Sequence, residues 1–278
     1  MRKNKKMNIL FQKEFQRVFG TFPLLGNELR NAVLTAAEVG YRAFDTAQMY
    51  KNEEAVGQAL QETQINRSDL CIITKIHPEN FSPSTFKESL MRSIENLRTN
   101  YIDILFLHWP PKDSSFEQTL DLLAEVQSEQ LVKSVGVSNF TSAMMKSAKA
   151  HLDVPLVANQ VEFHPLLDQS KLLQAANDTG IPLMSYSAIA RGKVFESELL
   201  QQLSSDYNKT VAQVVLRWVL QKGVIANSMS TKRNNIRDNF NVMDFVLSSI
   251  DMARIDDLQK ANYRIVTKEK VPWAPNWD

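Results

Sequence analysis

The feature that most constrains this fold is a regular alternation of short apolar runs with longer amphipathic segments along the 278 residues. Several runs are nearly continuous in apolar and β-branched residues, as is typical of parallel strands that are buried on both faces. An alternation of this kind favours an α/β protein. The predicted strands lie at residues 15–20, 41–45, 70–75, 102–108, 131–137, 155–161, 181–186 and 223–227.

The amphipathic segments between the runs predict helices. Segment 83–98 carries apolar residues at helical spacing, and Ser82 followed by Pro83 is a typical helix start. Gly40 is expected to end a helix over 28–39 in a left-handed conformation. Further helices are expected at residues 116–130, 210–222 and 251–261.

Strand–helix units without a flexible linker predict one domain, a (β/α)₈ TIM barrel over residues 15–278, after an N-terminal tail at 1–14. The structural alternative is a doubly wound sheet, which normally binds nucleotide through a glycine-rich first turn. The chain has only 8 glycines, and no two of them lie within two positions of each other. Glycine-rich nucleotide loops are therefore excluded, and any nucleotide must be held in another way.

Composition and charge limit the classes of function. The 32 Lys and Arg residues against 31 Asp and Glu give no basis for binding nucleic acid. Cys71 is the single cysteine, and the 4 histidines form no metal-binding pair, so neither a disulfide framework nor a metal site is expected. No apolar run is long enough to span a membrane, and the basic start lacks the features of a secretory signal. We expect a cytoplasmic, monomeric protein with a small-molecule substrate.

Four polar side chains follow predicted strands where a TIM barrel places its chemistry, at the carboxyl ends. They are Asp45, Tyr50, Lys75 and His108. Each alone has an ordinary explanation, such as a loop cap, a packed ring, a solvent-directed lysine or a core histidine. Together they favour acid catalysis at a carbonyl group. Lys75 would stabilise the anion of Tyr50, Asp45 would keep Lys75 protonated, and His108 would orient the substrate oxygen.

The nucleophile for such a reaction is missing from the sequence, because no serine or cysteine with a paired base is evident. A hydride from a nicotinamide cofactor would supply it. The ring of Tyr186 offers a face for stacking, and Lys232 with Arg233 at a helix start suits a phosphate. The amide or hydroxyl groups suited to a carboxamide belong to Ser138, Asn139 and Gln160. Two other hypotheses stay open, a lyase that uses Lys75 as a Schiff base and a non-catalytic NADPH-binding redox sensor.

The stretch from Gly40 to Glu53, GYRAFDTAQMYKNE, resembles the signature of the aldo-keto reductases. Further motifs follow in order at residues 74–75, 107–110, 136–140, 159–165, 230–233 and 273–278. The resemblance implies a TIM barrel that reduces aldehydes, dicarbonyls or keto-sugars with NADPH. It also implies a catalytic tetrad of Asp45, Tyr50, Lys75 and His108, in which Tyr50 donates the proton.

The resemblance also assigns binding residues. Substrate would contact Phe22, His108 and Trp109. The cofactor would contact Thr21, Ser138, Asn139, Gln160, Tyr186, Ser187, Ile189, Arg191, Gly192, Ser230, Lys232, Arg233, Asn235 and Asn239. The chain departs from the family at Met229 and Asn235, where many members carry a lysine and an arginine. NADH therefore stays open as an alternative to NADPH.

Overall fold

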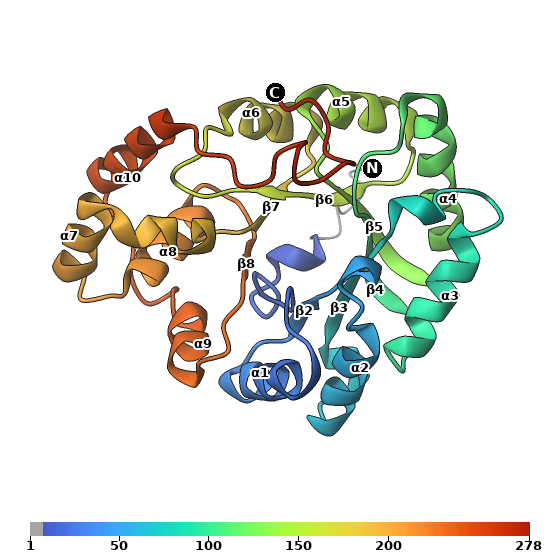
Figure 1. The fold of residues 1–278 in the computed structure, drawn as a ribbon, viewed down its shortest axis with the longest axis horizontal. Coiled ribbons are helices and arrows are strands. Elements are labelled where there is room, and N and C mark those ends of the chain that lie inside the picture. Colours follow the sequence, from blue (N-terminus) through green and yellow to red (C-terminus); the bar gives the residue numbers. More distant parts are fainter. Residues whose placement is uncertain (1–7) are drawn as a thin grey trace, which may run out of the picture.

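The computed structural model describes residues 8–278, and its eight parallel strands follow the order β7-β6-β5-β4-β3-β2-β1-β8. A parallel bridge between Met184 of β7 and Ile225, the residue before β8, closes the sheet into a barrel, which the helices surround (Figure 1). The predicted (β/α)₈ TIM barrel is confirmed. Its strands are β1 (Arg17–Gly20), β2 (Ala43–Asp45), β3 (Cys71–Ile76), β4 (Ile102–Leu107), β5 (Val132–Ser138), β6 (Leu156–Glu162), β7 (Leu183–Tyr186) and β8 (Ala226–Ser228).

All eight predicted strands are present, with their ends shifted by three residues or fewer. Gly40 ends the first helix at a φ of 123°, in the positive range as expected. The helices are α1 (Gly26–Val39), α2 (Glu53–Glu62), α3 (Phe86–Asn96), α4 (Phe116–Ser128), α5 (Ser142–His151), α6 (Ser170–Thr179), α7 (Glu198–Asp206), α8 (Val211–Gln221), α9 (Arg233–Phe240) and α10 (Ser249–Asp256).

The predicted start of α3 at Ser82 and Pro83 is wrong, because the helix begins only at Phe86. The hydroxyl of Ser82 lies 2.8 Å from that of Thr85, so it does not cap a backbone N–H. Residues 82–85 form a turn instead, in which the Ser82 carbonyl accepts from the N–H of Thr85 and of Phe86.

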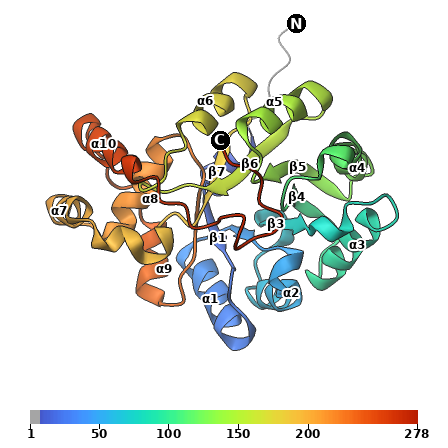
Figure 2. The same cartoon turned by 45° about the horizontal axis from the view of Figure 1, so that its top comes forward.

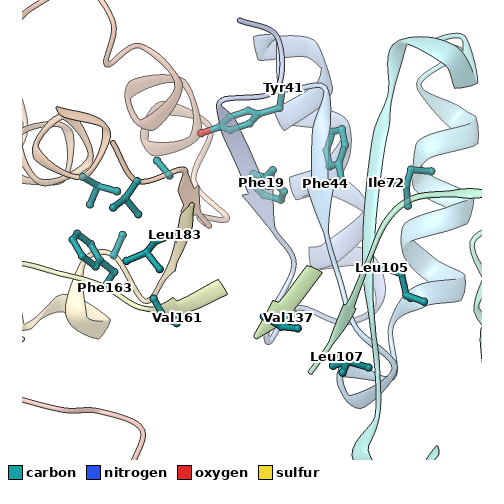
Figure 3. Packing of buried hydrophobic residues seen from close by; sticks show 14 of the residues in the cluster. Phe19, Tyr41, Phe44, Ile72, Leu105, Leu107, Val137, Val161, Phe163 and Leu183 are labelled. Atoms are coloured by element: carbon teal, nitrogen blue, oxygen red, sulfur yellow. The ribbon is translucent and has the colours of Figure 1, made fainter. Parts of the chain in front are cut away.

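Successive residues along each strand face two different apolar cores. One core lies between strands and helices and contains Phe44, Ile72 and Leu105 (Figure 3). The other fills the barrel interior and contains Ile73 and Phe106. Since successive strand residues face opposite sides, every second residue along β2, β3 and β4 points into the barrel. This alternation determines which polar side chains reach the barrel mouth.

The floor of the barrel is formed by part of the segment predicted as a tail. Residues 1–7 lie outside the described residues, but Leu10 is fully buried in the interior core. The Asn8 side chain accepts from Leu10 N and donates to the carbonyl of Val157 on β6 at 2.7 Å. The described part of the predicted tail therefore packs against the barrel rather than extending from it, because its apolar side chains cover the open end of the interior core.

The C-terminal segment, residues 263–278, crosses the opposite rim of the barrel, where the strands end (Figure 2). The buried carboxylate of Glu162, at the end of β6, accepts from the N–H groups of Ile265 at 2.7 Å and Val266 at 2.9 Å. Further along, the Trp273 ring packs edge-on against His77, which follows β3. Across residues 8–278, none of the helices is long and apolar enough to cross a membrane.

Candidate active site

Strand alternation brings three of the four predicted catalytic residues to one place. Ile73 and Phe106 face the barrel interior, so Lys75 and His108, two residues further along their chains, face it as well. Asp45 closes β2, which pairs directly with β3. All three side chains are buried, with residue exposures between 0% and 7%. The structure thus assembles a charged cluster at the mouth from strands far apart in the sequence.

The centre of this cluster is a buried ion pair. Lys75 Nζ donates to Asp45 Oδ1 at 2.7 Å, to Asp45 Oδ2 at 2.8 Å and to the carbonyl of Thr46 at 2.9 Å. Burial lowers the pKa of Lys75 from its ordinary value, and the charge and hydrogen bonds of Asp45 oppose that shift. With acceptors on all sides of the Nζ atom, the bonding pattern fits an ammonium group paired with a carboxylate.

Tyr50 joins the ion pair from the short helix Gln48–Tyr50 after β2. Its hydroxyl lies 3.4 Å from Lys75 Nζ. The Gln48 side chain fixes this turn by donating to the carbonyl of Ser89 and accepting from the N–H of His77. Burial, followed by the charge of Asp45, raises the pKa of Tyr50 well above 10. The shift follows from lost hydration, and the nearby Lys75 is bonded mainly to Asp45.

His108 lies beside the phenol, with its ring 5.5 Å from that of Tyr50 and nearly perpendicular to it. Burial, and then the charges of Lys75 and His77, lower the pKa of His108 well below 6.5. The imidazole is therefore neutral at pH 7. Its Nδ1 atom is buried without a hydrogen-bond partner among the described residues, and so is Nε1 of the stacked Trp109. Two unpaired polar atoms at the mouth are suited to a polar ligand.

Two amide side chains complete the bonding of Asp45. Gln160 Nε2 on β6 donates to Oδ1 at 3.2 Å, and Asn227 Nδ2 on β8 donates to Oδ2 at 3.1 Å. Gln160 was expected to contact a carboxamide, whereas Asn227 was not predicted as a site residue. The available signal was its position as the polar last residue of the predicted strand 223–227.

The other expected carboxamide contacts are bonded to one another. Asn139, at a φ of +64°, donates to the carbonyl of His108 at 3.0 Å and accepts from the Tyr186 hydroxyl at 2.8 Å. Ser138 Oγ donates to the carbonyl of Gln160 at 2.7 Å. Thr21 is also buried, and its hydroxyl donates to the carbonyl of Asp45. These residues therefore form one layer around the charged cluster.

The remaining predicted contacts lie at the edge of the mouth. The Phe22 side chain is 51% exposed, and its ring lies 5.0 Å from that of Tyr50. The loop after β7 contains a series of residues with positive φ, namely Ser187, Ala190, Arg191 and Gly192. Ile189 in the same loop is partly buried. Within this loop the N–H groups of Ala190 and Gly192 donate to the carbonyls of Ser187 and Ile189, so the chain forms tight local turns.

The predicted phosphate segment begins α9. Lys232 and Asn235 are exposed, whereas Asn239 is buried. Ser230 Oγ accepts from the N–H of Lys232 at 3.2 Å. Arg233 pairs instead with Glu38 of α1 at 2.6 Å. Among the side chains that the structure describes, none forms a salt bridge with Lys232, and Lys232 is exposed, so it is the more available cation of the pair.

Comparison with known proteins agrees with this architecture. The family model described as "Aldo/keto reductase family" matches residues 19–260. Methylglyoxal reductase DkgB of Escherichia coli O157:H7 is 39% identical over 93% of this chain and 97% of its own length. Glyoxal reductase of Bacillus subtilis strain 168 is 37% identical over 84% of this chain and 85% of its own.

Solved structures give the same result. A crystal structure with the provisional name 2,5-diketo-D-gluconic acid reductase B has a TM-score of 0.91 at 38% identity, covering 95% of each chain. An aldo-keto reductase of Bombyx mori, in complex with NADP, has a TM-score of 0.84 at 28% identity, covering 93% of this chain and 94% of its own. The chain belongs to the aldo/keto reductase family and is an oxidoreductase that acts on carbonyl groups.

Proposed function

We propose that this enzyme reduces small aldehydes, dicarbonyls or keto-sugars to alcohols, with NADPH as the hydride donor and Tyr50 as the proton donor. The main support is the contact between the Tyr50 hydroxyl and an ammonium, Lys75, that also binds both carboxylate oxygens of Asp45. The relatives named methylglyoxal reductase and glyoxal reductase support small dicarbonyls as substrates.

Proton transfer in this proposal depends on the buried cluster. NADPH, when bound, supplies the hydride that the carbonyl carbon receives. Tyr50 holds its proton at neutral pH, because its pKa is raised. As negative charge develops on the substrate oxygen, Tyr50 transfers its hydroxyl proton to that oxygen, and the Lys75 ammonium stabilises the phenolate that remains. Burial strengthens this stabilisation, since little water screens the two groups.

His108 would orient the substrate oxygen. A neutral imidazole carries one N–H donor, and a donor aimed at developing negative charge lowers the barrier. Trp109 stacks on His108 with ring centroids 6.1 Å apart and would form one wall of the substrate pocket. The exposed ring of Phe22 would form another.

The polar side chains around the cluster suit NADPH as acceptors. The N–H groups of Asn139 and Gln160 already donate within the protein, so the oxygens of Ser138, Asn139 and Gln160 would accept from the N–H groups of a carboxamide, and Tyr186 offers an aromatic face. The other residues of the proposed cofactor site are Thr21, Ser187, Ile189, Arg191, Gly192, Ser230, Lys232, Arg233, Asn235 and Asn239. Lys232 would bind the phosphate that distinguishes NADPH from NADH. The partly buried Met229, which packs against the core, offers no charge there.

A Schiff-base reaction at Lys75 fits the geometry less well. A Schiff-base lysine requires a neutral amine, and Asp45 favours the ammonium form through two hydrogen bonds. We expect no covalent adduct on Lys75 when borohydride is added with a carbonyl substrate, as judged by mass spectrometry.

The proposed function is tested by Tyr50→Phe, assayed for NADPH oxidation with methylglyoxal. Loss of the proton donor should reduce kcat about 10²- to 10⁴-fold. Tyr101→Phe is the matched control, because Tyr101 lies just before β4, at the end of the barrel opposite the mouth. Activity of Tyr50→Phe within a few-fold of wild type would rule out the assignment. Binding of NADPH without turnover of any carbonyl by the wild-type protein would favour the redox-sensor hypothesis.

A further inference from the structure

The side chain of Asn227 is a buried polar group whose role the proposed reaction leaves unexplained. It lies on β8, with the residue 8% exposed, and its Nδ2 atom donates to Asp45 Oδ2 at 3.1 Å. An amide at a buried strand end loses its hydration, which costs free energy unless hydrogen bonds replace it. The bond to Asp45 is therefore the contact that Asn227 gains in return.

Asn227 makes the bonding of the Asp45 carboxylate symmetrical. Oδ1 accepts from Lys75 and Gln160, and Oδ2 accepts from Lys75 and Asn227. Each oxygen thus has one ammonium donor and one amide donor. Two amides on opposite sides restrict rotation of the carboxylate, so both oxygens stay directed at Lys75.

The reach of Asn227 depends on a gap in the neighbouring strand. β1 lies between β8 and β2 in the sheet, so the Asn227 side chain must pass β1 to meet Asp45. β1 ends in Gly20, which is paired with Asp45 on β2. A Cβ atom on Gly20 would lie only 2.7 Å from Asn227 Oδ1. The missing side chain of Gly20 therefore provides the space that the amide occupies.

The other end of the amide supports the same reading. Asn227 Oδ1 is buried without a hydrogen-bond partner among the described residues. The reverse orientation of the amide would direct this oxygen at the Asp45 carboxylate, which is unfavourable because both groups are acceptors. The Oδ1 atom of Asn227 thus stays unpaired while its Nδ2 atom donates to Asp45. We interpret the hydrogen bond to Asp45 as the contribution of the Asn227 side chain to the site.

We propose that Asn227 is a positioning residue, which reaches through the gap at Gly20 to hold the Asp45 carboxylate against Lys75 and so controls proton transfer from Tyr50. The inference rests on the proposed function, because it concerns the same reaction centre. Asn227 acts through Asp45 and is not proposed to touch substrate.

The charged and titratable groups around Asp45 determine the expected effect on pH dependence. Lys75 faces Asp45 from β3, and Tyr50 faces it from the helix after β2. The charge of Glu53 on α2 raises the pKa of Lys75, and the charge of Lys75 lowers the pKa of His108. Loss of the Asn227 donor leaves the charge of Asp45 less compensated. That charge raises the pKa of Tyr50, so the alkaline limb of the kcat profile should move to higher pH.

The test compares Asn227→Leu, which removes the donor at similar volume, with Asn227→Asp. For Asn227→Leu we expect kcat to fall about tenfold, the alkaline limb to rise, and KM and the Kd for NADPH to change little. For Asn227→Asp we expect activity relative to wild type to recover as pH is lowered, since the new carboxyl gains a proton that it can donate to Asp45. A purely structural role would leave the alkaline limb unmoved, and a cofactor contact would raise the Kd; either result overturns the proposal.

The gap is tested by Gly20→Ala. In the wild-type background we expect the same shift of the alkaline limb as in Asn227→Leu, because the new methyl group displaces the amide. In an Asn227→Ala background, where the space is free, Gly20→Ala should add little. Equal effects in the two backgrounds would contradict the proposed passage through β1.

A measurement without turnover separates this inference from the proposed function. Unfolding free energies of Asn227→Leu, Asp45→Asn and the double variant form a cycle that reports the coupling between the two side chains. We expect the double variant to be more stable than the sum of the single effects. Additive effects would overturn the positioning role even if the enzyme reduces methylglyoxal, whereas strong coupling would uphold the contact even if no carbonyl is reduced.

Discussion

Two ion pairs of nearly equal length in this enzyme lie in opposite environments. Lys75 and Asp45 approach to 2.7 Å with side-chain exposures of 0% and 3%, whereas Arg233 and Glu38 approach to 2.6 Å with exposures of 67% and 59%. The distance between the charged atoms is thus a poor guide to how much an ion pair contributes to stability. Water screens the second pair, while the first is surrounded by protein dipoles that hold it in a single arrangement.

The difference separates two kinds of site. The Asp45–Lys75 pair is fully bonded before any ligand arrives, which is what preorganised stabilisation of developing charge requires. At the start of α9, Arg233 is occupied by Glu38 and Lys232 is exposed, so binding there must order side chains that are free to move. We therefore expect substitutions in the buried cluster to affect stability and rate strongly, and substitutions in α9 to affect mainly cofactor preference.

The largest effect is expected for Lys75→Met. Removing the ammonium leaves the Asp45 carboxylate buried without its main partner, which should lower the free energy of unfolding by about 3–5 kcal/mol. The exposed counterpart, Arg233→Ala, should change it by less than about 1 kcal/mol. Denaturant unfolding of both variants measures the contrast. The double variant Asp45→Asn with Lys75→Met should regain part of the stability but no activity. Equal losses of unfolding free energy in Lys75→Met and Arg233→Ala would refute the difference between the buried and the exposed ion pair.

An intermediate effect is expected from the buried imidazole of His108. The folded protein holds it neutral, with a pKa well below 6.5, whereas the unfolded chain takes up a proton near 6.5. The unfolded state therefore binds more protons below pH 6.5, and the folded state loses stability as pH falls. The wild type should lose up to about 1.4 kcal/mol per pH unit relative to His108→Gln in this window.

The measurement for His108 is the free energy of unfolding of both proteins between pH 7 and the most acidic pH at which both still fold. The difference between them should be constant above about pH 6.5 and grow below it. A difference that stays constant over the whole range would mean that the imidazole takes up its proton equally in folded and unfolded protein.

The smallest effect is expected for Lys232→Ala. An exposed lysine that meets a phosphate should contribute modestly, so we expect about fivefold weaker binding of NADPH, or about 1 kcal/mol. Binding of NADH, which lacks that phosphate, should change by less than about twofold. Titrations of both cofactors by tryptophan fluorescence measure the Kd values. Equal weakening of NADPH and NADH would place Lys232 outside the proposed phosphate site.

Local pattern was enough to predict the eight strands and five of the ten α-helices that the structure describes. Apolar runs and helical periodicity depend on neighbours within a few residues, and the barrel follows from their alternation. The exception at Ser82 and Pro83 has a local cause as well, because the Ser82 hydroxyl bonds to neighbouring hydroxyls in a turn. The cap expected at Gly40 was right, whereas the start expected at Ser82 was not.

The candidate site was predictable only in part. Asp45, Lys75 and His108 stand where strands end, and a barrel places such ends at one rim, so the sequence indicates their meeting. The raised pKa of Tyr50 was not predictable from sequence, because sequence gives the charge of a neighbour but not the degree of burial. The bonds of Gln160 to Asp45 and of Asn139 to His108 and Tyr186 were not predicted, because they join strands that are distant in the sequence.

The sequence by itself determined the succession of strands and helices, the family and the four residue types at the strand ends, because each of these depends on residues that are close together in the chain. Only the tertiary structure decided what those residues bond to. Asn227 meets Asp45 across 182 positions, and it does so because closure of the barrel brings β8 beside β1 and because Gly20 leaves room for the amide. Hydrogen bonds between distant strands depend on register and closure, which no local pattern of residues specifies.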